Sequence, residues 1–169
     1  MKPLMTAAHR LAHAMHVVSG ALLILMVLTV LVDIITRTVF GATEGAVDLT
    51  FPGSVEIVSF GLLYMVLFSL PYSVSRGQVI VDLFTEGLSD RMKEVLEAIY
   101  TIGFGLLGVG MAIRYFEAIG RSADSGETSQ DLLIPLEYIY AITAFAAAVL
   151  AIRGLLVALE QIIAAGRQK

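Results

Sequence analysis

Charged side chains that could take part in ion or proton chemistry stand at the edges of two apolar runs. Asp33 and Arg37 are four residues apart near the end of the first run, so a helix places them on one face. Glu56 opens the second run and is expected at a similar depth. The three residues predict an ionic cluster, which is either an ion or proton site or a clamp that fixes two helices or docks a partner subunit. We favour the clamp, because the arginine already neutralises one carboxylate and repels a cation.

Glycines in the third apolar run match a cofactor-binding pattern. Gly103, Gly105 and Gly108 spell G-x-G-x-x-G, which at a turn from strand to helix indicates dinucleotide binding. Here no strand precedes the pattern, and its surroundings predict an apolar helix. We therefore interpret these small residues as faces on which another helix packs closely. The predicted helix-packing residues of the third and fourth runs are Gly103, Gly108, Gly110, Ala112, Ala144 and Ala148.

The only three histidines, His9, His13 and His16, share a helix face at the start of the first run. Their spacing suits metal ligands, but a haem held between two spans needs imidazoles on facing helices. We interpret them as interfacial residues. The chain has no cysteine, and no histidine stands near a serine in a recognisable nucleophile elbow. The sequence therefore predicts no catalytic residue, no cofactor and no metal site, and it argues against an enzyme.

The composition indicates what these residues are embedded in. Hydrophobic residues make up 57% of the 169 residues, charged residues only 15%, and the mean hydropathy is +0.84. Such a chain cannot cover its apolar surface with polar side chains, so we expect it to lie in lipid. The net charge of −4 and the scattered Lys and Arg residues exclude nucleic acid as a partner.

Four runs with at most two charged residues each are long enough to cross a bilayer as helices. We predict an all-α integral membrane protein that forms a single four-helix domain over residues 1–169. The expected spans are roughly 12–36, 55–75, 96–116 and 134–159.

The segment between the second and third spans is expected to form a surface amphipathic helix over roughly residues 79–94. Its apolar residues recur at helical spacing, and Ser89 is placed as an N-cap. Lys and Arg are concentrated on the side of this segment and of both termini, so we expect both termini in the cytoplasm. Both loops on the other side are polar and net acidic, with acids at Glu44, Asp48, Asp124, Glu127 and Asp131.

Motifs at three places resemble those of one family. The first span ends in Asp33-Ile-Ile-Thr-Arg37-Thr-Val-Phe40-Gly41, similar to acid-x-x-x-Arg-x-x-Phe-Asn, and Glu56 matches an acid that opens the second span. The cytoplasmic loop motif Arg76-Gly77-Gln78-Val79-Ile80-Val81-Asp82 resembles R-x-G-x-H-I-x-V-D in shortened form. Before the fourth span, Ser129-Gln130-Asp131-Leu132-Leu133-Ile134-Pro135 resembles S-x-D-L-x-I-P. The chain thus resembles the small membrane subunit, Q or DctQ-type, of tripartite ATP-independent periplasmic (TRAP) transporters.

The resemblance implies a bacterial inner-membrane protein that does not itself carry substrate. In such systems a large M subunit moves an organic acid with sodium ions by an elevator-like displacement, and a soluble periplasmic P protein delivers the acid. The small subunit is a fixed scaffold, so sodium coupling is expected in the large partner. The five loop acids are then the expected docking surface for the P protein, and the glycine or alanine face is expected to pack on the M subunit.

Two other functions remain open from the sequence. A self-contained, homo-oligomeric four-helix exporter would use Asp33 or Glu56 as its coupling carboxylate. A membrane enzyme or electron carrier would hold a chromophore or a lipid substrate, and the lack of cysteines and of deep histidines argues against it.

Overall fold

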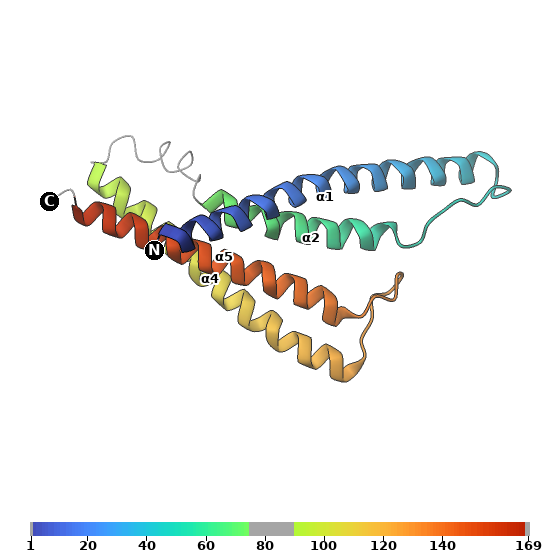
Figure 1. The fold of residues 1–169 in the computed structure, drawn as a ribbon. Helices are drawn as coiled ribbons and strands as arrows, with labels where there is room; N and C mark the ends of the chain where they lie inside the picture. The colour runs from blue at the N-terminus through green and yellow to red at the C-terminus, as the bar shows by residue number, and fades with distance from the viewer. Residues whose placement is uncertain (1, 75–89, 168–169) are drawn as a thin grey trace.

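The computed structural model describes residues 2–74 and 90–167 of the chain. Within them, the long elements are four helices: α1 (Lys2–Ala42), α2 (Ser54–Ser73), α4 (Asp90–Ser125) and α5 (Leu136–Arg167) (Figure 1). All four are long and apolar enough to cross a membrane. The expected all-helical class with four candidate spans is confirmed.

Three of the helices, α1, α4 and α5, extend well past the expected spans, whereas α2 nearly coincides with its expected span. α1 has 41 residues, so at 1.5 Å per residue it is about 60 Å long, roughly twice the hydrocarbon thickness of a bilayer. It ends where the backbone turns left-handed at Glu44 and Gly45, and the Gly45 N–H donates to the carbonyl of Phe40 at 2.9 Å. The loop motif residues Arg76, Gly77 and Asp82 lie outside the described residues. So do residues 79–89 of the expected amphipathic segment, whereas residues 90–94 begin α4.

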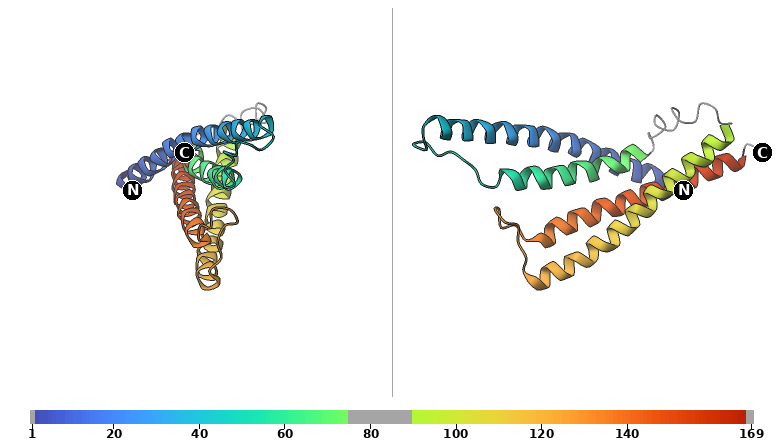
Figure 2. Two further views of the ribbon diagram at one scale, coloured as in Figure 1. Left: turned by 90° about the vertical axis from the view of Figure 1, so that its right-hand side faces the viewer. Right: turned by 180° about the vertical axis from the view of Figure 1, so that it is seen from behind.

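The helices form two hairpins, α1 with α2 and α4 with α5. The hairpins meet near the chain termini and diverge toward their two loops (Figures 1 and 2). α5 is the central helix, because 61% of its most apolar window is buried, against 11–22% for the other three. One core cluster joins Met15 of α1, Leu67 of α2 and Val149 of α5.

α1 contacts α2 along a narrow stripe with a seven-residue spacing. The Ser19 hydroxyl donates to the carbonyl of Met65 at 2.8 Å, and Met26, only 6% exposed, lies over Gly61. Two helical turns further, Asp33 meets the start of α2. A seven-residue spacing returns side chains to one face of a helix, so these three residues all face α2. The remaining faces of α1 expose apolar side chains that lipid or a partner must cover.

The α4–α5 crossing brings two backbones into contact. A Cβ built on Gly154 would lie 2.8 Å from the Cα of Gly105, and one built on Gly108 would lie 2.6 Å from the backbone nitrogen of Ala151. Only glycine permits these approaches. α4 and α5 are therefore held at a separation that larger residues would not allow.

Candidate functional site

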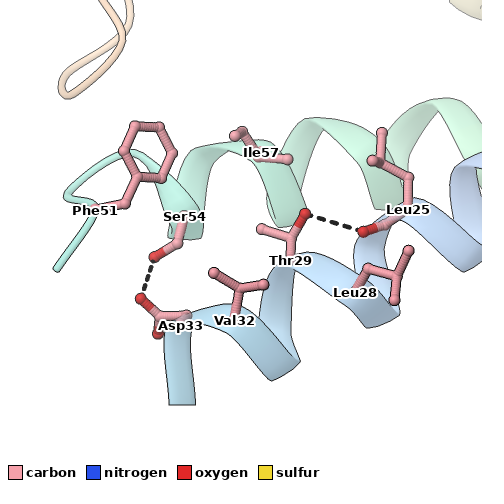
Figure 3. A pocket seen from close by; sticks show the side chains of 8 residues that line it. All are labelled: Leu25, Leu28, Thr29, Val32, Asp33, Phe51, Ser54 and Ile57. Atoms are coloured by element: carbon pink, nitrogen blue, oxygen red, sulfur yellow. Dashed lines mark hydrogen bonds between the residues drawn. The ribbon is translucent and has the colours of Figure 1, made fainter. Parts of the chain in front are cut away.

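Asp33 joins α1 to α2 through both of its carboxylate oxygens. Oδ2 accepts from Nε of Arg37 at 2.8 Å, and Oδ1 accepts from the Ser54 hydroxyl at 2.8 Å (Figure 3). The bond from Arg37 is local, since both residues lie on one face of α1. The bond from Ser54 joins α1 to the first residue of α2 and so fixes where the second span begins.

Glu56 has different partners. Its Oε1 accepts from the backbone N–H of Asp131 and its Oε2 from the N–H of Leu132, both at 2.9 Å. Ser129 and the backbone of Gln130 also interact with this carboxylate. The structure therefore brings Asp33 and Arg37 together, as expected. Glu56 does not complete the expected three-residue cluster, because it binds the loop before α5 instead.

The loop held by Glu56 has a defined internal structure. The Ser129 N–H donates to the carbonyl of Ile134 at 2.9 Å, and the Ile134 N–H donates to the Ser129 hydroxyl at 3.1 Å. Leu132 packs on Gly53, where any Cβ would collide with the leucine side chain. Leu133 adopts a left-handed conformation with φ of 52° and is 67% exposed. Since a branched residue rarely adopts this conformation, the surrounding bonds must impose it.

A pocket of about 330 Å³ lies beside Asp33, between α1 and α2 (Figure 3). Apolar side chains form most of its wall, and the remaining residues are Thr29, Asp33 and Ser54. The Thr29 hydroxyl donates to the carbonyl of Leu25, and Asp33 is bonded as above. Among the described residues, no group of three or more His, Asp or Glu side chains is arranged to hold a metal ion. The polar groups of this pocket therefore bond to the protein itself.

The predicted packing residues divide between an internal and an external surface. Gly108 contacts the backbone of Ala147 and Ala151 of α5, whereas Gly103 and Gly110 have nothing within 4 Å of an added Cβ. Three of the predicted alanines line an open apolar groove of about 650 Å³ on the outside of the α4–α5 pair: Ala112, Ala144 and Ala148.

The five acids expected in the loops are all exposed, but Asp124 lies in the last turn of α4, and only Glu44, Asp48, Glu127 and Asp131 lie in loops. The loops and the end of α4 lie at the end of the molecule away from the termini (Figure 1). Asp48 accepts from both the hydroxyl and the backbone N–H of Thr50, and these bonds hold the pKa of Asp48 below its usual value. This carboxylate remains charged under ordinary conditions. The structure thus presents a net acidic surface at the loop end.

Sequence reasoning did not identify several residues that the structure makes important. Ser54 bonds to Asp33, Leu132 packs on Gly53, and Gly154 forms a close helix contact with Gly105, the one residue of these that the glycine pattern had marked. The Ser129–Pro135 motif was the available signal for the loop. No sequence signal paired Gly105 with Gly154, because they are far apart in the chain and on separate helices.

Comparison with known proteins gives one family. The sequence model described as "Tripartite ATP-independent periplasmic transporters, DctQ component" matches residues 26–164, which include most of the chain and all four helices in whole or in part. No curated protein and no solved structure matches the chain. The family is a non-enzymatic transporter component that works in a tripartite system. With its four candidate spans and its DctQ match, the chain belongs to the family of small membrane subunits of TRAP transporters.

Proposed function

We propose that this chain is the scaffold of a bacterial inner-membrane transporter for organic acids, and that it holds a large M subunit in place. The observation that carries this proposal is that its acidic side chains near the spans bind to the chain itself. Asp33 joins α1 to α2, and Glu56 joins α2 to the loop before α5. A carrier needs polar groups near mid-membrane that are free to bind cargo.

The M subunit covers an outer face of α4 and α5. The groove lined by Ala112, Ala144 and Ala148 supports this location, because its small floor residues permit close approach of another helix. Gly103 and Gly110 add open positions on α4. Substrate and sodium ions are handled by the M subunit, and this chain contributes a fixed surface.

The loop end faces the periplasm and contributes to docking of the P protein, and both termini face the cytoplasm. The five exposed acids at that end support a partner surface with basic residues. The bonds from Glu56 give the second loop a fixed shape before any partner arrives, which lowers the ordering cost of docking.

The test is reconstitution under an inward sodium gradient. We expect uptake of a radiolabelled organic acid only when this chain, the M subunit and the P protein are all present. Uptake or export by the purified chain alone would contradict the scaffold and favour the self-contained exporter. That exporter needs Asp33 or Glu56 free to exchange ions, whereas both carboxylates are bonded within the chain.

A further inference from the structure

A polar pocket of about 370 Å³ lies at the loop end of α4, apart from Asp33 and Glu56. Its wall carries both signs of charge and three hydroxyl groups, from Ala118, Arg121, Ser122, Ser125, Glu127 and Tyr140. Arg121 and Glu127 form no ion pair with each other or with any other described residue. Ser122 is only 3% exposed, and its hydroxyl has no hydrogen-bond partner among the described residues. Because such a buried group is rare in a folded protein, it points to a molecule bound in the pocket.

The pocket opens on the side of α4 that faces the other hairpin. Ala118, Ser122 and Ser125 follow Met111 by seven, eleven and fourteen residues, and these spacings return to one face of a helix. Met111 itself packs against the core cluster that joins α1, α2 and α5. The pocket therefore continues the core-facing side of α4 toward the loops.

Apolar side chains become exposed where the hairpins separate toward the loops (Figure 1). On one face of α5, Val149 of the core cluster is 6% exposed, Ile142 is 41% exposed and Tyr138 is 60% exposed. On α2, Phe60 stands seven residues before the buried Leu67 and so shares its face. Another molecule must cover the apolar surface between the hairpins.

The length of this uncovered stretch identifies the class of molecule. From Met111 to Ser122, α4 rises about 16 Å, roughly half of the hydrocarbon thickness of a bilayer. The core cluster closes the stretch toward the termini, and the bonds from Glu56 to the second loop join the hairpins at the other end. A partner helix that crosses the bilayer needs its full thickness, whereas a phospholipid occupies one leaflet. The stretch therefore has the depth of a lipid.

The charges of the pocket select the headgroup. The rings of Tyr115 and Tyr140 lie 6.0 Å apart within two helical turns of Arg121, and such aromatic rings are typical of the headgroup level. An arginine beside serine hydroxyls suits a phosphate, and the Glu127 carboxylate suits an ammonium group. Phosphatidylethanolamine carries both groups. Phosphatidylcholine has a trimethylated ammonium that cannot donate a hydrogen bond to Glu127.

We propose that this pocket binds the headgroup of phosphatidylethanolamine from the leaflet on the loop side. Arg121 and Ser122 donate to the phosphate, and Glu127 accepts from the ammonium. The acyl chains run along the Met111 face of α4 and cover Phe60 and Ile142. The lipid thus fills the space in which the hairpins diverge, and the other four acids at this end stay available to the P protein.

The first experiment detects the acyl chains. The chain has no tryptophan, so Phe60→Trp creates a single fluorescent reporter between the hairpins. The full chain is placed in phosphatidylcholine nanodiscs with a minor fraction of phosphatidylethanolamine whose acyl chains carry bromine, which quenches a tryptophan on contact. Val27→Trp is the control, because Val27 is 52% exposed on α1 and its neighbour Met26 lies over Gly61, so its depth matches that of Phe60.

Brominated phosphatidylethanolamine should quench the Phe60→Trp chain about two- to fivefold more than the Val27→Trp chain, the preference that one ion pair near the surface provides. Brominated phosphatidylcholine at the same fraction should give no such excess. Ile142→Trp reports the same lipid from α5, so the result does not depend on how the Phe60 variant folds. Equal quenching of the reporter and control chains by brominated phosphatidylethanolamine would overturn the proposal.

The second experiment tests the headgroup in the Phe60→Trp chain. Glu127→Gln and Arg121→Gln each remove one of the two charges, so each should abolish the excess quenching by phosphatidylethanolamine. Asp124→Asn is the matched control, because Asp124 is an exposed acid in the last turn of α4 that does not line the pocket. An excess that survives in either pocket variant, or that disappears in the Asp124→Asn variant, would assign the lipid to another site.

The third experiment asks whether a protein occupies this space instead. The Phe60→Trp chain is reconstituted as a complex with its M subunit in the same nanodiscs. The excess quenching should remain, because the lipid lies inside the small subunit. Its disappearance in the complex would show that a helix of the partner displaces the lipid, and it would overturn the proposal.

Discussion

The Glu56 carboxylate of α2 accepts a hydrogen bond at 2.9 Å from the backbone N–H of Leu132, a residue 76 positions later in the chain. The same leucine side chain packs on Gly53, directly before α2. The start of α2 and the residue before it therefore hold the loop between α4 and α5 by both a polar and an apolar contact. These contacts lie at the end where the hairpins otherwise diverge (Figure 1).

Removing the Glu56 carboxylate should free this loop. In a Glu56→Ala variant the N–H groups of Asp131 and Leu132 lose their acceptors, so their amide hydrogen exchange should become roughly tenfold faster or more. Glu44→Ala is the control, because Glu44 is an exposed loop acid of the other hairpin. Equal exchange of the two amides in the parent and in the Glu56 variant would show that the carboxylate does not hold the loop.

The glycine contact between α4 and α5 predicts that the effect of an alanine substitution on stability depends strongly on which glycine is replaced. Gly154→Ala places a methyl group 2.8 Å from the Gly105 backbone and should cost about 1–3 kcal/mol, measured as a lower midpoint of thermal unfolding in detergent. Gly103→Ala meets open space and should be neutral or stabilise by up to about 1 kcal/mol, because alanine favours a helix. A Gly154→Ala protein as stable as the parent would contradict the close packing.

Binding of the M subunit should be separable from folding of the chain. Gly103→Leu fills an open outer position, so we expect several-fold less co-purified M subunit with an unchanged unfolding midpoint. Gly108→Leu should lower both quantities, because the leucine collides with the backbone of Ala151. Undiminished recovery of the M subunit with the Gly103→Leu chain would remove this face from the proposed interface.

Asp33 tests whether the chain is a scaffold or a carrier. Asp33→Asn retains an oxygen that accepts from Ser54 but removes the negative charge beside Arg37, whose side chain is 57% exposed and already screened by its surroundings. We expect the assembled transporter to keep most of its sodium-driven uptake, within about twofold of the parent. Complete loss of uptake with normal assembly would indicate that Asp33 is a coupling carboxylate.

The sequence by itself determined that the chain forms helices and that these helices are apolar enough to lie in a membrane. Long apolar runs with few charges require spanning helices, and this property is local, so it can be read from composition and length. The Asp33–Arg37 contact was equally predictable, because two residues four apart on a helix meet whatever the rest of the chain does.

Only the tertiary structure decided which distant groups meet. Glu56 was expected beside Asp33 from its depth alone, but the approach of the second loop to α2 gives it two backbone donors instead. Gly108 was identified as a packing residue, but the sequence left open whether its partner is the fourth span or the M subunit, and the crossing of α4 and α5 gives it a partner within the same chain. The three histidines were assigned to one face, whereas their contact with Tyr72, and the contact of His9 with Arg153, depend on how both hairpins converge. Helix periodicity fixes the face on which a residue lies, but the partner of that face depends on rotations and crossings that no local pattern records.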